Sequence, residues 1–189
     1  MKAAIGTAIS SVLTSPTLRD TRRLLASAKR RLTGSAAQVH YFHQADDPYS
    51  HLLVQLLPGL LERYRIELQV HLVPAPEDSA APDRARLQGW SRGDAARLAA
   101  HTGLSFADHA QQPVAERLQA AEGLLAAALE HGRFAHNAVR VSQWLWDEQE
   151  DLPQGLSPLP ASEVARLLEA GAALRKQLVF ENRRRSARQ

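Results

Sequence analysis

Residues 38–72 read QVHYFHQADDPYSHLLVQLLPGLLERYRIELQVHL. The stretch opens with β-branched and aromatic residues at 38–43, which are typical of a strand. It closes with residues 66–72, where apolar and polar side chains alternate with a period of two. Between them, apolar residues recur at helical spacing over 48–64, and Pro58 is expected to kink this helix. A strand, a helix and a second strand at this spacing predict a βαβ unit with parallel strands.

The segment before this unit, residues 1–36, is predicted to hold a basic amphipathic helix. Ser15 is a good N-cap, Pro16 is tolerated at the first helical position, and Gly34 ends the helix. Leucines alternate with arginines and lysines between them. Such a helix packs on the body, lies on an anionic membrane surface or contacts an acidic partner.

The chain after the βαβ unit (residues 37–74) is predicted to be helical. Ala, Leu and Arg recur at helical spacing in four segments, at 83–102, 113–131, 133–148 and 162–179. We expect one helical region over 83–180 and a frayed polar tail over 181–189. The predicted fold class is therefore α/β, mostly helical overall.

Composition excludes several classes of function. The chain has no cysteine, so its own residues cannot perform thiol–disulfide exchange or supply thiolate ligands to a metal. No segment approaches the roughly 20 apolar residues of a membrane span, and a cytoplasmic location is expected. The net charge is +3, but no stacking aromatics accompany the basic clusters, so no nucleic-acid partner is expected. The oligomeric state stays open, a homo-oligomer included.

The candidate site is the turn after the first strand. In open α/β sheets, ligands bind beyond the carboxyl ends of the strands, where helix N–H groups also point. Polar side chains gather there, and they are His43, Asp46, Asp47, Tyr49, Ser50 and His51. Their spacing matches no specific metal site, so no metal is expected.

These residues carry a resemblance to a known family. The motif consists of Val39-His40-Tyr41-Phe42, Asp47-Pro48-Tyr49-Ser50 and Leu52-Leu53. It resembles the DsbA-like branch of thioredoxin-fold proteins, closest to 2-hydroxychromene-2-carboxylate isomerases and kappa-class glutathione transferases. The resemblance implies a thioredoxin-like βαβ unit with a large helical insertion, glutathione as cofactor and a small-molecule substrate. It makes Asp47 and Ser50 the candidate catalytic residues. The candidates for binding glutathione are Pro48, Tyr49, His43, His51 and, on the helical insertion, Asn137.

The chain departs from the family pattern in two ways. Position 47 is Asp, where the family has Cys or Ser, and a carboxylate accepts hydrogen bonds but repels a thiolate. The helix N-terminus is expected to favour the charged form of Asp47, which makes it a weak base. Ser50, one turn further on, is the alternative donor. The family's cis-proline loop and C-terminal strands also have no counterpart after residues 175–180, so these strands are expected to be missing.

An ordinary structural explanation accompanies each candidate. Asp47 followed by Pro48 is a good helix start without any ligand. Ser50 is then a first-turn residue, and Tyr49 a packing residue. Two functions follow from the sequence. One is a glutathione-dependent isomerase or transferase, and the other is an inactive thioredoxin-like binding module that acts through its surface and basic N-terminal helix.

Overall fold

The computed structural model describes residues 32–147, 153 and 155–187, together with the single positions 21, 24 and 28. For residues 183–187 it describes the backbone alone. The basic helix predicted within residues 1–36 therefore lies largely outside the described residues, and so does its proposed contact with lipid or an acidic partner.

The predicted βαβ unit is confirmed. Strand β1 spans Ala37–His43, helix α3 spans Pro48–Arg63 and strand β2 spans Ile66–Leu72. The strands pair in parallel, with Ala37 opposite Ile66 and His43 opposite Leu72. Helix α3 continues through Pro58 to Arg63. The sheet among the described residues has these two strands.

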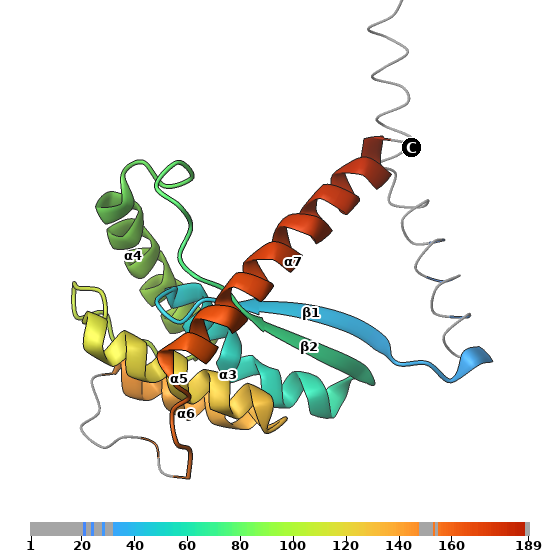
Figure 1. The fold of residues 1–189 in the computed structure, drawn as a ribbon, viewed down its shortest axis with the longest axis horizontal. Coiled ribbons are helices and arrows are strands. Elements are labelled where there is room, and N and C mark those ends of the chain that lie inside the picture. Colours follow the sequence, from blue (N-terminus) through green and yellow to red (C-terminus); the bar gives the residue numbers. More distant parts are fainter. Residues whose placement is uncertain are drawn as a thin grey trace, which may run out of the picture.

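Helices make up most of the described chain after the βαβ unit (Figure 1). Each begins within two residues of its predicted start. They are α4 (Arg84–Thr102), α5 (Ala115–Glu130), α6 (Phe134–Trp146) and α7 (Ala161–Ala187). The fold is therefore mostly helical with a small parallel sheet. None of the helices in the described ranges is long and apolar enough to cross a membrane.

The carboxyl end of α7 corrects one prediction. The sequence predicted a frayed tail over 181–189, but α7 continues to Ala187. The polar residues of this segment are compatible with a helix, because Arg, Glu and Ala are strong helix formers. The Gln177 side-chain amide also donates to Glu181 at 3.0 Å, a pair one helical turn apart.

The core lies on the side of the sheet where α3, α5 and α6 are grouped (Figure 1). Tyr41 on β1 and Leu72 on β2 point into it, and Leu124 and Leu125 on α5 are fully buried. The ring of Phe134 on α6 meets that of Tyr41 edge-on, with centroids 6.2 Å apart. The alternation of β1 therefore gives it one apolar face that packs on helices.

The two outer edges of the sheet have different neighbours. Val73 N–H donates to the His43 carbonyl, so the backbone of the alternate residue, Leu72, points to the outer edge of β2. Helix α7 meets that edge at Gly171, where a Cβ atom would lie 2.0 Å from the Leu72 oxygen. Among the described residues, no strand pairs with the outer edge of β1.

Candidate functional site

Asp47 is the last residue of the turn between β1 and α3. Its backbone is extended (φ −102°, ψ 121°), and Pro48 follows at the start of the helix. One carboxylate oxygen, Oδ2, accepts from Ser50 N–H at 2.8 Å and from Ser50 Oγ at 2.9 Å. A serine hydroxyl has one hydrogen, and Ser50 already donates it to Asp47. Asp47 is therefore a helix N-cap in this structure, and Ser50 completes the cap.

The charge state of Asp47 corrects an expectation from the sequence. The helix N-terminus was expected to favour the ionised form. Instead, burial raises the pKa of Asp47 above its ordinary value, and the charge of Asp46 raises it further. The hydrogen bonds from Ser50 act in the opposite direction but do not cancel the cost of burial. Asp47 thus binds a proton more readily than a solvent-exposed aspartate.

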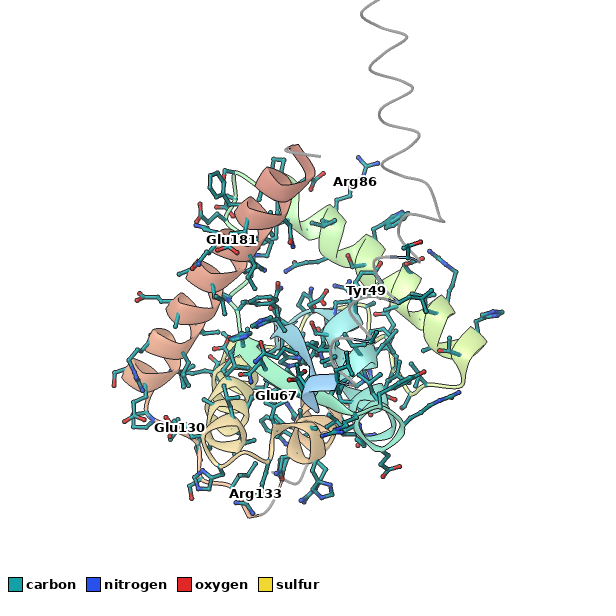
Figure 2. The ribbon with its side chains drawn as sticks, turned by 90° about the vertical axis from the view of Figure 1, so that its right-hand side faces the viewer. Tyr49, Glu67, Arg86, Glu130, Arg133 and Glu181 are labelled. Atoms are coloured by element: carbon teal, nitrogen blue, oxygen red, sulfur yellow. The ribbon has the colours of Figure 1, made fainter. Side chains whose placement is uncertain are left out.

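Tyr49 points away from the turn, toward α4. Its hydroxyl donates to Asp94 Oδ2 at 2.8 Å, and 37% of the residue is exposed. Figure 2 shows Tyr49 on the side of α3 that faces α4. Pro48, by contrast, is fully buried. The tyrosine therefore joins α3 to α4 through two residues that lie 45 positions apart in the sequence.

His43 is buried in the core. Only 1% of it is exposed, and its Nδ1 lies 2.8 Å from the Tyr41 hydroxyl. Burial, with a smaller contribution from His51, lowers the pKa of His43 to about 3. The ring is therefore neutral at physiological pH. It does not line the cavity at the turn.

His51 is also a core residue, with no exposed surface. Its Nε2 lies 3.0 Å from the Ser105 carbonyl oxygen and 3.2 Å from the Gln55 amide nitrogen. Its Nδ1 lies 2.8 Å from Ser142 Oγ. Burial lowers the pKa of His51 as well. Both ring nitrogens are thus used in joining α3 to α6 and to the loop at Ser105.

Asn137 lies away from the turn. Its amide donates to the Arg133 carbonyl within α6 at 3.0 Å. The part of α6 that reaches the turn is Trp146, whose indole N–H donates to the Ala45 carbonyl at 3.2 Å. Nine residues separate Asn137 from Trp146, or about 13 Å along the helix. The residue of α6 that supports the turn is therefore Trp146.

A small polar cavity of about 110 Å³ opens beside Asp47. Its lining comes from the turn, from residues 76–91 and from Gln112, and consists of Gln44, Asp46, Asp47, Pro48, Pro76, Ala81, Arg84, Leu87, Gln88, Ser91 and Gln112. Gln112 Oε1 is buried, and no hydrogen-bond partner for it lies among the described residues. Arg84 is already bound to Asp78 and to the Pro76 carbonyl. Pockets that enclose drug-sized ligands are larger, roughly 300–1,000 Å³.

The structure thus brings Asp47, Pro48 and Ser50 together at the turn, buries His43 and His51 in the core beneath it, and places Asn137 further along α6. Within the described ranges, no group of three or more His, Asp or Glu side chains is placed to hold a metal ion. Comparisons of the chain with protein-family models, curated proteins and solved structures gave no match.

Proposed function

We propose that this chain is a thioredoxin-like binding module that contacts a partner protein and performs no glutathione chemistry at the β1–α3 turn. One observation carries the proposal. The single hydroxyl hydrogen at the turn, on Ser50, is donated to Asp47 at 2.9 Å, and Ser50 N–H is bound to the same oxygen. A thiolate placed there would meet a carboxylate and find these two donors occupied.

The thioredoxin-like part of the proposal rests on the resemblance and on the local geometry. A parallel strand–helix–strand unit with Asp47-Pro48 at the helix start fits the expectation from the DsbA-like branch. The turn lies beyond the carboxyl end of β1, where that branch has its site. The absence of cysteine removes the redox chemistry of the branch.

An exposed apolar surface next to the turn supports partner binding. We call it the α3–α4 surface, and its residues are Tyr49, Leu53, Leu56, Leu87, Trp90 and Leu98. The two helices lie side by side, because Leu52 packs on Ala95 and Ala99 and because Tyr49 is bonded to Asp94. Trp90 is 68% exposed and Leu56 is 50% exposed. Large exposed apolar side chains on two adjacent helices are the observation that supports a protein partner here.

Thermal unfolding with glutathione tests the proposal. Glutathione at ten times its dissociation constant would stabilise the folded chain by about 1.4 kcal/mol. For a chain of this size, that stabilisation would raise the midpoint by about 4 °C. We expect no rise at millimolar glutathione for the wild-type chain. A saturable rise that disappears in Ser50→Ala would overturn the binding-module proposal.

The second candidate is a glutathione-dependent isomerase or transferase, and the raised pKa of Asp47 favours it. A buried carboxyl with a raised pKa beside a polar cavity is a candidate general base. In this function Asp47 moves the substrate proton, while Ser50, Tyr49 and the first-turn N–H groups hold the cofactor sulfur. Glutathione binding that survives in Asp47→Asn, with turnover lost, is the result this candidate requires.

A further inference from the structure

A second cavity, of about 430 Å³, lies between α5 and the first turns of α7. Figure 1 shows these turns beside α5, and the two helices are in contact. The volume of the cavity falls within the range of roughly 300–1,000 Å³ that is typical of ligand pockets. Its lining shares no residue with that of the cavity beside Asp47. The two helices therefore form a separate place where a small molecule can bind.

One wall of this cavity is held in place by a close approach of the chain to α5. The Leu159 N–H donates to the Gly123 carbonyl at 3.1 Å. A Cβ atom at Gly123 would lie 2.8 Å from the Pro158 Cβ, so a side chain there would push this segment away. Pro158 and Leu159 both line the cavity. The wall that they form therefore has a fixed position on α5.

The lining combines apolar walls with negative charge. The apolar side chains come from both helices and from the segment before α7, and they include Leu159, Val164 and Leu168. Two carboxylates on α5, those of Glu116 and Glu122, line the same cavity. Among the described residues that line it there is no lysine, arginine or histidine. A ligand with an apolar body and a positive charge is therefore complementary to this lining.

Glu122 is the carboxylate that lacks a partner of opposite charge. The residue is partly buried, and neither a hydrogen bond nor an ion pair joins its carboxylate to another residue in the described part of the chain. Burial raises the pKa of Glu122, and the charge of Asp46 raises it further. A carboxylate withdrawn from water without a partner costs free energy. A cation bound beside it would offset that cost.

We infer that the cavity between α5 and α7 binds an organic ammonium ion with an apolar body, whose nitrogen lies against Glu122. An ammonium group has donors alone and a carboxylate has acceptors alone, so the two pair without a third group. A metal ion is not the ligand expected here, since the described residues place no group of three or more acidic or histidine side chains to hold one. The inference goes beyond the proposed function, because it concerns a small molecule and a different part of the fold.

Titration of the full chain with phenethylamine, followed by residue-resolved NMR at neutral pH, is the first test. This amine is a cation with an aromatic body, and we expect saturable shifts at the amides of Leu159 and Val164. Phenethyl alcohol has the same body without the charge. It should bind at least about tenfold more weakly, because it lacks the charge-assisted hydrogen bond to Glu122. No saturable shift at millimolar amine, or equal binding of the amine and the alcohol, overturns the inference.

The substitution Glu122→Gln tests the carboxylate itself. Glutamine keeps the shape of the side chain and removes its charge, so phenethylamine should bind at least about tenfold more weakly. Glu62→Gln is the matched control, because it removes a charge from an exposed position on α3 outside the lining. It should leave binding unchanged. Unchanged binding in Glu122→Gln contradicts the assignment, and so does equal weakening in the two variants.

A second pair of variants tests the cavity through its size. Ala165 is an exposed residue of α7 that lines the cavity, so Ala165→Leu narrows the space for the aromatic ring and should weaken binding several-fold. Ala170→Leu makes the same change at an exposed position of α7 outside the lining and should bind like the wild type. Equal binding by the two variants would place the amine outside the cavity and overturn the inference.

The amine site and the proposed function fail in different ways. A chain that ignores phenethylamine loses the amine site and leaves the binding-module proposal intact. Saturable glutathione binding at the β1–α3 turn overturns the binding module and leaves the amine site intact.

Discussion

Asp47 accepts hydrogen bonds from two groups at the start of α3. Both go to one oxygen, from the N–H and the hydroxyl of Ser50. At the scale of single residues, the two hydrogen-bond donors of Ser50 are therefore already used within the turn. The same carboxyl is partly buried, which raises its pKa. Its position at the buried start of α3 therefore explains both its role as a helix cap and its raised pKa.

The role of Asp47 as a helix cap predicts that truncating its side chain lowers the stability of the chain. Asp47→Ala should lower the free energy of unfolding by about 1 kcal/mol, because it removes the acceptor for Ser50 N–H. Asp47→Asn keeps an acceptor oxygen and should lose less. Urea unfolding of the three chains at neutral pH measures both differences. An alanine variant as stable as the wild type would show that the cap contributes nothing.

Asp47 also predicts a pH dependence in acid. Its folded-state pKa is raised above its ordinary value of 3.8, so the folded chain holds the proton more strongly than the unfolded chain does. Its contribution to stability is therefore fully present below pH 3.8 and is lost as the pH rises through the folded pKa. Asp47→Asn should remove this part of the pH profile. Comparing urea unfolding curves of the two chains across the acid range tests the sign.

His43 predicts the opposite pH dependence. Its pKa in the folded chain is about 3, against 6.5 when exposed, so only the unfolded chain takes up this proton at intermediate pH. Stability should therefore fall by about 1.4 kcal/mol for each pH unit below 6.5, down to about pH 3. His51, whose pKa is also lowered, adds to the slope. The opposite contribution of Asp47 reduces this slope of stability against pH only near the pKa of Asp47.

Two substitutions test whether His43 causes this pH dependence. His43→Phe should flatten the pH profile, because no buried imidazole remains at that position to be protonated on unfolding. Tyr41→Phe removes the hydroxyl beside His43 but keeps the ring buried, so the slope should persist. Equal slopes in the wild type and His43→Phe, from urea unfolding at several pH values, would refute the assignment.

At the scale of elements, α7 is positioned by one close approach. Its backbone meets the outer edge of β2 at Gly171, with no room for a side chain. Lys176 and Glu77 add an ion pair of 3.2 Å further along the helix, but both side chains are largely exposed. Exposed pairs contribute little. The placement of α7 over the sheet edge therefore depends mainly on steric fit.

Two glycine substitutions test this contact. Gly171→Ala should destabilise the chain by about 2 kcal/mol or more, because the added Cβ would lie 2.0 Å from the Leu72 carbonyl oxygen and force α7 away. Gly59→Ala on α3 is the matched control, since nothing lies within 4 Å of its added Cβ. It should stabilise by up to about 1 kcal/mol through helix propensity. Equal effects of the two substitutions in thermal unfolding would contradict the close approach.

At the scale of the whole molecule, the sheet is small and covered asymmetrically. Helices cover its core face, and α7 crosses the edge of β2, while the outer edge of β1 pairs with no strand in the described part of the chain. An isolated pair of strands is marginal in water, so the helices supply most of the stability. An unpaired edge is also a place where another strand can add.

Hydrogen exchange tests this asymmetry. The backbone of odd-numbered β1 residues points to β2, so their amides should exchange slowly, while the even-numbered amides face the open edge and should exchange fast. Residue-resolved exchange by NMR measures both groups. The protected amides are those of Val39, Tyr41 and His43, and the fast ones are those of Gln38, His40 and Phe42. Slow exchange throughout β1 would show that another strand covers the edge.

The sequence by itself determined the local elements. Period-two alternation in residues 66–72 and helical spacing in 48–64 predicted the βαβ unit and its parallel strands. Asp47-Pro48 predicted the start of α3, and the four later helices began where their Ala and Leu periodicity began. These features are local, because they depend on the backbone period and on caps within one turn of the chain.

Only the tertiary structure decided what the polar residues near the turn do. Tyr49 binds Asp94, His51 binds Ser142, and Trp146 reaches the Ala45 carbonyl, across gaps of 45, 91 and 101 residues. No local period encodes such pairs, since they depend on which helices pack together. Burial follows from the same packing, and it reverses the expected charge preference of Asp47 by withdrawing the carboxyl from water.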